Sequence, residues 1–147
     1  MSHLGLEVAI AEARLGLDEG GIPIGSALLI GEEVLGRGHN GRIQRGSAIL
    51  HGEMDALENA GRLPASTYRR TTIYTTLSPC DMCTGAILLY GIPQVVVGEN
   101  RTYMGAEDHL RDHGVRVEVL DDGRCVEMMT NFIADNPELW NEDIGET

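Results

Sequence analysis

One histidine, two cysteines and a glutamate are the residues of this sequence best suited to metal chemistry. His51-Gly52-Glu53 stands about 25 residues before Pro79-Cys80-Asp81-Met82-Cys83. Residues three apart on a helix face the same side, so Cys80 and Cys83 can hold one ion between them. At the start of a helix, free amide groups and the helix dipole favour the thiolate form that a metal requires. The spacing therefore predicts a metal site.

Zinc is the metal that this donor set predicts. Two thiolates and one imidazole fill three positions of tetrahedral Zn²⁺ and leave the fourth open for water, as in catalytic zinc sites. We predict one Zn²⁺ per chain, held by His51, Cys80 and Cys83. Residues two apart on a regular helix point in nearly opposite directions, so His51 and Glu53 can converge only at a helix start or around the ion.

Two other interpretations of the cysteine pair are a thioredoxin-like redox couple and a closed structural zinc site. Neither explains the His-x-Glu pattern, and a closed site requires a fourth ligand, which only Cys125 offers in principle. Cys125 falls in an apolar helical pattern with Met129 and Phe132, which predicts a buried, inert thiol.

Two further patterns resemble ligand sites. Residues 36–41 satisfy G-x-G-x-x-G after a predicted strand, but a dinucleotide site needs a helix to open at once, and residues 42–46 are predicted to continue as a loop. His109 and His113 have the spacing of a metal clamp on a helix, but acids and arginines surround them and no third ligand is evident. We interpret both histidines as solvated surface residues.

Composition narrows the function further. The chain has 147 residues, a net charge of −12 and no lysine, which excludes Schiff-base chemistry and a P-loop. The strongly acidic balance argues against binding duplex nucleic acid, whose affinity comes from basic contacts to phosphate. No run approaches 18 apolar residues, and the first 16 residues mix acids with apolar residues, so we expect a cytoplasmic protein without a membrane span or secretory signal.

Strands and helices alternate along the sequence after an initial hairpin. We predict strands over 27–30, 34–36, 71–77, 94–98 and 115–120, and helices over about 4–15, 47–60, 78–90, 105–113, 122–135 and 137–143. Apolar residues at Leu4, Val8, Ala11 and Leu15 mark the first helix, Ser47 is a candidate cap for the second, and Ser78-Pro79 for the third. This order predicts an α/β fold in one domain, 1–147: a three-layer α/β/α sandwich around a mixed five-stranded sheet.

The motifs together resemble a known family. His-x-Glu followed by Pro-Cys-x-x-Cys is the signature of the zinc deaminases, a match to a pattern rather than a derivation. The chain resembles the cytidine deaminase-like superfamily, and within it the yeast-type cytosine deaminases of fungi. The resemblance covers nearly the whole chain. The motif at residues 140–146, Trp-Asn-Glu-Asp-Ile-Gly-Glu, is more specific to the yeast-type group than the two motifs shared by the superfamily.

The resemblance implies roles for individual residues. Glu53 is then the unligated acid and base, and the Ser78 carbonyl faces the amino group that leaves. Three groups bind the pyrimidine edge and three side chains wall the pocket: respectively Asn40, the Gly52 backbone and Asp143, and Ile24, Tyr103 and Trp140. The family has phenylalanine where this chain has Tyr103, so the added hydroxyl bears on which base is preferred. The resemblance also implies a homodimer.

The activity that we expect is zinc-dependent hydrolytic deamination of free cytosine to uracil and ammonia. The same chemistry on guanine, isocytosine or an aminotriazine is an alternative. Deamination of adenosine in tRNA is another, opposed by the charge of −12. A non-catalytic zinc-stabilised binding domain is a third, opposed by the intact Glu53.

Overall fold

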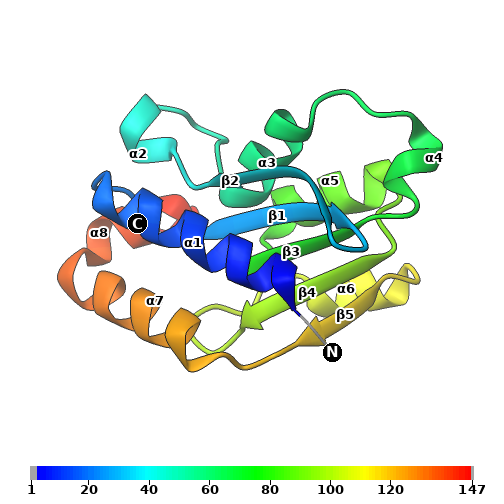
Figure 1. Cartoon of the computed structure of the whole chain (residues 1–147). Coiled ribbons are helices and arrows are strands. Elements are labelled where there is room, and N and C mark those ends of the chain that lie inside the picture. Colours follow the sequence, from blue (N-terminus) through cyan, green and yellow to red (C-terminus); the bar gives the residue numbers. More distant parts are fainter. Residues whose placement is uncertain (1–2, 147) are drawn as a thin grey trace.

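A five-stranded sheet lies at the centre of the fold (Figure 1), and the computed structural model describes residues 3–146. The strands are β1 (Gly25–Ile30), β2 (Glu33–His39), β3 (Thr72–Leu77), β4 (Gln94–Glu99) and β5 (Arg116–Val119). The helices are α1 (Leu4–Asp18), α2 (Arg42–Arg45), α3 (Gly52–Ala60), α4 (Ala65–Tyr68), α5 (Asp81–Tyr90), α6 (Glu107–Asp112), α7 (Gly123–Asp135) and α8 (Pro137–Asp143).

The sheet is mixed, with strand order β2-β1-β3-β4-β5. β1 pairs antiparallel with both β2 and β3, whereas β3, β4 and β5 run parallel to one another. Leu77 at the end of β3 is paired with Glu99 at the end of β4, and Gly25 at the start of β1 is paired with His39 at the end of β2. This register brings four chain segments to one end of the sheet, where the loops before α2, α3 and α5 begin.

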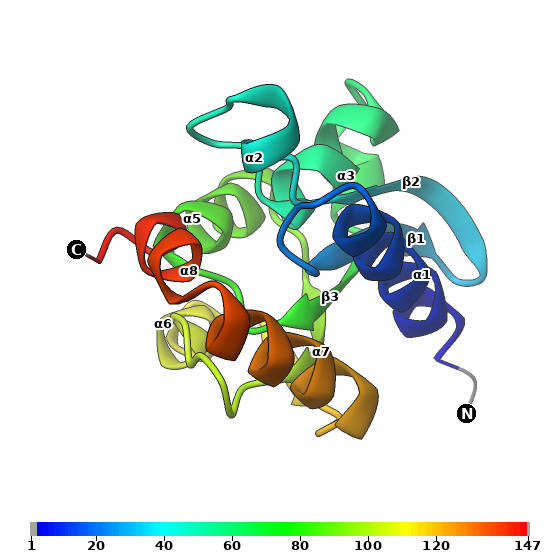
Figure 2. The same cartoon turned by 90° about the vertical axis from the view of Figure 1, so that its left-hand side faces the viewer.

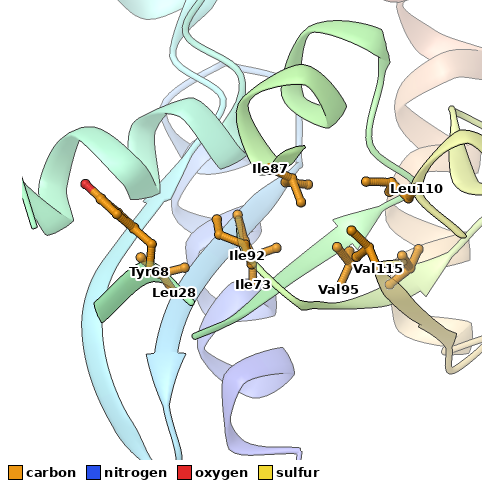
Figure 3. Close-up of a cluster of buried hydrophobic side chains, with 9 residues drawn as sticks. Leu28, Tyr68, Ile73, Ile87, Ile92, Val95, Leu110 and Val115 are labelled. Atoms are coloured by element: carbon orange, nitrogen blue, oxygen red, sulfur yellow. The ribbon is translucent and has the colours of Figure 1, made fainter. Parts of the chain in front are cut away.

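Helices cover both faces of the sheet, which confirms the predicted three-layer α/β/α arrangement (Figure 2). On one face, α3, α4, α5 and α6 pack on a cluster drawn in Figure 3, with side chains from β1, β3 and β4 such as Leu28, Ile73 and Val95. On the other face α1 and α7 form two smaller clusters around Ile10 and Met129. Among the described residues, no helix is long and apolar enough to cross a membrane.

The predicted first helix forms, but its predicted apolar face is wrong. Leu4 and Leu15 are exposed, whereas the buried face of α1 combines Leu6 and Ile10 with small residues, namely Gly5, Ala9, Ala13 and Gly16. Small residues let the α1 backbone approach the sheet closely, and that close packing outweighs the larger leucines on the outer face. The residues at the predicted spacing that begin and end the pattern, Leu4 and Leu15, therefore face solvent.

The helix that carries His51 and Glu53 begins five residues later than predicted. Ser47 caps only a turn, accepting from the amides of Ile49 and Leu50 at 3.2 and 3.1 Å, and α3 starts at Gly52. The third predicted helix likewise starts late, at Asp81, because Cys80 rather than Ser78 takes the N-cap position. In both cases a metal-ligating residue type occupies the N-cap, which places it at the sheet end rather than along a helix face.

Close backbone contact fixes α3 on the sheet. A Cβ atom at Gly36 of β2 would collide with the Ala56 carbonyl of α3, so only glycine allows this approach. At the end of β2, the amide of His39 donates to Asp55 Oδ2 at 2.9 Å. The pattern at residues 36–41 thus serves helix packing, and only the one-turn helix α2 follows it, not the long helix of a dinucleotide site. The turns α2 and α4 had no predicted helix.

Candidate functional site

A site forms at the end of the sheet where α3 and α5 begin and α8 lies across them. Figure 2 shows α2, α5 and α8 at this end. His51 is the N-cap of α3 and has extended backbone angles, φ −66° and ψ 163°. Because His51 stands just outside the helix and Glu53 just inside it, both side chains face the same space. The two residues thus converge at a helix start.

The three predicted ligand residues come together. His51 Nδ1 lies 3.3 Å from Cys80 Sγ and 3.8 Å from Cys83 Sγ. All three donor atoms lie within 4.8 Å of one another, and they form the one such group among residues 3–146. Ligand atoms around tetrahedral zinc are separated by about 3.5–3.8 Å, given metal–ligand bonds of about 2.1–2.3 Å. The donor set and its spacing fit zinc.

The electrostatics of the cysteine pair favour one thiolate. The hydrogen bond from Cys83, and then that with His51, lower the pKa of Cys80 to about 4. The pKa of Cys83 is raised, because its proton is held by Cys80 and the thiol is buried. Burial lowers the pKa of His51, but Cys80 and the nearby carboxylates outweigh it and raise the value to about 9. Because thiol and imidazolium ligands must lose their protons to bind a metal, metal binding at this group releases protons.

Glu53 is buried beside these ligand residues. Its side chain lines the same cavity, and Glu53 is only 4% exposed. Burial raises the pKa of Glu53 to about 7, against the opposing effect of His51. A carboxyl group with a pKa near neutrality can both accept and donate a proton, which is what general acid–base catalysis at neutral pH requires.

A small cavity of about 20 Å³ lies over Glu53 and His51. Five of the seven predicted substrate contacts line it, namely Ile24, Ser78, Tyr103, Trp140 and Asp143. The rings of Tyr103 and Trp140 meet edge to face, with centroids 5.8 Å apart. This volume holds about one water molecule. The cavity in this structure is therefore smaller than a heterocyclic ring.

The other two predicted contacts, Asn40 and Gly52, are not among the residues that line the cavity. Asn40 is buried, and its Nδ2 donates to Asp143 Oδ1 at 3.1 Å. Asp143 Oδ2 faces His51 Nε2 at 3.5 Å. Gly52 is buried as the first residue of α3, between His51 and Glu53. The arrangement holds a buried carboxylate, Asp143, in the wall of the cavity that Glu53 also lines.

Comparison with known proteins places this geometry in a family. Residues 2–99 match the cytidine and deoxycytidylate deaminase zinc-binding region. The chain belongs to this family. It is 59% identical over 143 residues to the cytosine deaminase of Candida albicans, covering 97% of this chain and 95% of that protein. It is 35% identical over 137 residues to a tRNA-specific adenosine deaminase of Streptococcus pyogenes, covering 86% of each.

Solved structures share the fold of this deaminase. A structure from a study of tRNA:A34 deaminases has a TM-score of 0.73 at 25% identity, covering 84% of this chain and 97% of that one. Guanine deaminase from Nitrosomonas europaea has a TM-score of 0.67 at 20% identity, covering 90% and 85%. The predicted cytidine deaminase-like fold and zinc-dependent deaminase family are thus confirmed.

Several residues of the deaminase site were not predicted from the sequence. Leu77 and Ile144 complete the cavity wall, and Arg42 contacts Asp143. Glu107 accepts a hydrogen bond from Ser78 Oγ and is buried. Leu77 and Ile144 could have been predicted as cavity-lining residues, because they are the apolar neighbours of Ser78 and Asp143 in the sequence. Arg42 and Glu107 had no such signal, because each pairs with a residue far away in the sequence.

The remaining candidate ligands of the deaminase lie outside the site. Cys125 is buried with Leu6 and Ile10 between α1 and α7, and burial raises its pKa to about 12. Such a thiol is a poor metal ligand and a poor nucleophile. His109 and His113 stack with ring centroids 4.4 Å apart at α6, and no third ligand residue joins them among the described residues.

Proposed function

We propose that this deaminase converts free cytosine and water to uracil and ammonia. The observation that carries the proposal is that two buried acidic residues, Glu53 and Asp143, line one small cavity together with His51 and Cys80, whose donor atoms cluster with that of Cys83. The 59% identity to a cytosine deaminase over nearly the whole chain supports this substrate over those of more distant relatives.

His51, Cys80 and Cys83 would hold the zinc ion. Zinc, when bound, acts as a Lewis acid that lowers the pKa of water toward neutrality. His51 Nε2 faces the carboxylate of Asp143. A carboxylate on the second ring nitrogen fixes the orientation of a ligating imidazole.

Glu53 moves the protons of the reaction. Its carboxylate accepts a proton from the attacking water and transfers it to ring N3 as oxygen adds to C4. It then takes the second proton of that oxygen to the amino group, which leaves as ammonia. The C4–N bond breaks, a C4–O double bond forms, and Glu53 returns to its starting state. Burial of Glu53 keeps these transfers away from bulk water.

The other polar groups at the site recognise the ring. Asp143 accepts a hydrogen bond from ring N1–H, and Asn40, which donates to Asp143 Oδ1, binds the same edge of the ring. The Gly52 amide lies at the start of α3, where backbone N–H groups are free to donate to a ring carbonyl. The carbonyl of Ser78 accepts from the departing amino group, and Ile24, Tyr103 and Trp140 pack on the ring faces.

A free base suits this site better than a nucleic acid. The charge of −12 opposes phosphate binding, which disfavours the tRNA substrates of the Streptococcus pyogenes relative. Guanine is the alternative substrate to test, because guanine deaminase from Nitrosomonas europaea shares this fold.

Ammonia release from a panel of free bases tests the proposal. The zinc-loaded parent should release ammonia from cytosine faster than from guanine, isocytosine or adenine. Glu53→Gln should keep zinc but lose at least about 10²- to 10⁴-fold in rate, since it removes general acid–base catalysis. Preference for guanine, or near-parent activity in Glu53→Gln, would overturn the assignment.

We also propose a homodimer, in line with the family resemblance. Leu89 and Tyr90 at the end of α5 are exposed at 75% and 41%, and they border a groove of about 910 Å³ along α3 and α4. Light scattering should give twice the chain mass of 15.9 kDa for the parent, and Leu89→Glu should shift it toward the monomer. A monomeric parent would contradict the proposal.

A further inference from the structure

Arg42 forms hydrogen bonds with three residues at or next to the site: Asn40, Glu142 and Asp143. Its side chain is 12% exposed and reaches from α2 to α8, which lie at the same end of the sheet (Figure 2). Arg42 Nη1 donates to Asp143 Oδ1 at 3.2 Å. Nη1 and Nη2 donate to the two carboxylate oxygens of Glu142, each at 2.7 Å. The backbone amide of Arg42 donates to Asn40 Oδ1 at 3.0 Å.

The two ion pairs of Arg42 differ in how much they contribute energetically. The pair with Glu142 is exposed on the carboxylate side, and such pairs contribute little by themselves. The pair with Asp143 is different, because the Asp143 side chain is only 2% exposed. A carboxylate that is removed from water needs a cation or several donors to remain favourable.

Arg42 is the permanent cation beside Asp143. The other basic group near Asp143 is His51, at the longer distance of 3.5 Å. The guanidinium of Arg42, at 3.2 Å, therefore compensates the charge of Asp143. Asn40 donates a neutral hydrogen bond to the same oxygen, Oδ1. Both donors bind Oδ1, whereas Oδ2 faces His51 Nε2.

We infer that Arg42 is a positioning residue of the deamination, holding Asp143 and α8 so that the carboxylate can bind the ring. This inference rests on the ring-binding role proposed for Asp143. The fork geometry requires arginine: Nε donates to the Ala48 carbonyl at 2.9 Å while both terminal nitrogens bind carboxylates. A lysine ammonium supplies charge but cannot make this set of contacts.

Steady-state kinetics with cytosine separate positioning from general stability. Arg42→Gln should lower kcat/KM at least about tenfold, chiefly through KM, with zinc content unchanged. Arg42→Lys should recover part of the loss because it restores the charge. Arg45→Gln is the matched control, since Arg45 is exposed on the same helix and makes no ion pair among the described residues. It should stay within about twofold of the parent.

A double substitution tests whether Arg42 acts through Asp143. In an Asp143→Asn background, Arg42→Gln should change kcat/KM by less than threefold, because the carboxylate that it positions is gone. Equal effects in both backgrounds, or an Arg42→Gln enzyme within twofold of the parent, would overturn the inference alone. A parent that deaminates none of the bases would overturn the proposed function, and this inference with it.

Discussion

The hydroxyl of Ser78 donates a hydrogen bond of 2.6 Å to the carboxylate of Glu107, which is only 2% exposed. The same hydroxyl oxygen accepts from the Gly105 amide at 2.9 Å, and Asn100 donates to the other Glu107 oxygen at 3.2 Å. The loop that carries Tyr103 is therefore fastened to the residue two places before Cys80. This connection couples the cavity wall to the metal-ligand turn.

Ser78→Ala should remove this connection while keeping the backbone carbonyl that we assign to the substrate. One oxygen of a buried carboxylate loses its partner, so the free energy of unfolding should fall by about 1.5–3 kcal/mol. Urea denaturation of the zinc-loaded protein measures it. Ser66→Ala, at an exposed serine of α4, should change the value by less than about 0.5 kcal/mol. Equal losses in the two variants would show that the Glu107 contact does not stabilise the site.

Gly105→Ala should disrupt the same loop by steric collision. A Cβ atom at this position would collide with the carbonyl oxygen of Pro79, the residue next to Cys80. Backbone atoms cannot move aside cheaply, so we expect a loss of at least about 2 kcal/mol in unfolding free energy and lower zinc content. Gly85→Ala is the control, at an exposed position of α5 where a Cβ atom meets nothing within 4 Å, and it should gain up to about 1 kcal/mol in helix propensity. Comparable melting temperatures for both variants would contradict the packing argument.

His39 should make stability depend on pH. Its ring nitrogens lie 2.8 Å from Glu12 and 2.8 Å from Glu19. Burial alone would lower the pKa of His39, but the two carboxylates outweigh it and raise the value above 6.5. A raised folded-state pKa stabilises the protein fully below the unfolded value, and this stabilisation is lost as pH rises through the folded one.

The unfolding free energies of the parent and His39→Gln should therefore differ more at pH 6 than at pH 9. Urea denaturation at both pH values, at constant ionic strength, provides the comparison. A difference that is equal at both pH values would mean that the carboxylates hold a neutral imidazole, contrary to the ion pairs described here.

Removal of one metal ligand should remove zinc without removing the fold. We expect close to one zinc per chain in the parent and substantial loss in Cys80→Ala, because two remaining donors bind zinc weakly. Cys125→Ala is the matched control, since this thiol is buried away from the site and should leave zinc content unchanged. Elemental analysis after dialysis measures both. Full zinc in Cys80→Ala would refute the ligand assignment.

The order of strands and helices was predictable from the sequence because periodicity and turn residues are local signals. The Asp122 cap of α7 and the Gly91 stop of α5 are examples, and both appear in the structure. Helix starts near the site were not predictable in this way. Ser47 and Ser78 have cap chemistry, yet His51 and Cys80 occupy the caps because strand register and tertiary contacts bring them to the sheet end.

The same distinction between local and long-range signals applies to the site. His51 and Glu53, and likewise Cys80 and Cys83, are close in sequence, so their spacing alone identified them as candidates. Arg42 and Glu142 are 100 residues apart and meet only because α2 and α8 lie at the same end of the sheet. The outer face of α1 misled the prediction because close packing selects small residues, which carry a weak hydrophobic signal.

The ratio of kcat/KM for cytosine to that for cytidine tests the central claim most directly. The N1–H of cytosine can donate a hydrogen bond to Asp143, whereas cytidine carries ribose at N1, which must also fit in the cavity that Trp140 lines. Sites built around a buried hydrogen bond discriminate by about 10⁴ against analogues that lack it. We predict a ratio of that order for the zinc-loaded parent and a much smaller turnover of cytosine in Asp143→Ala. Comparable values for cytosine and cytidine would contradict both the role of Asp143 and deamination of the free base.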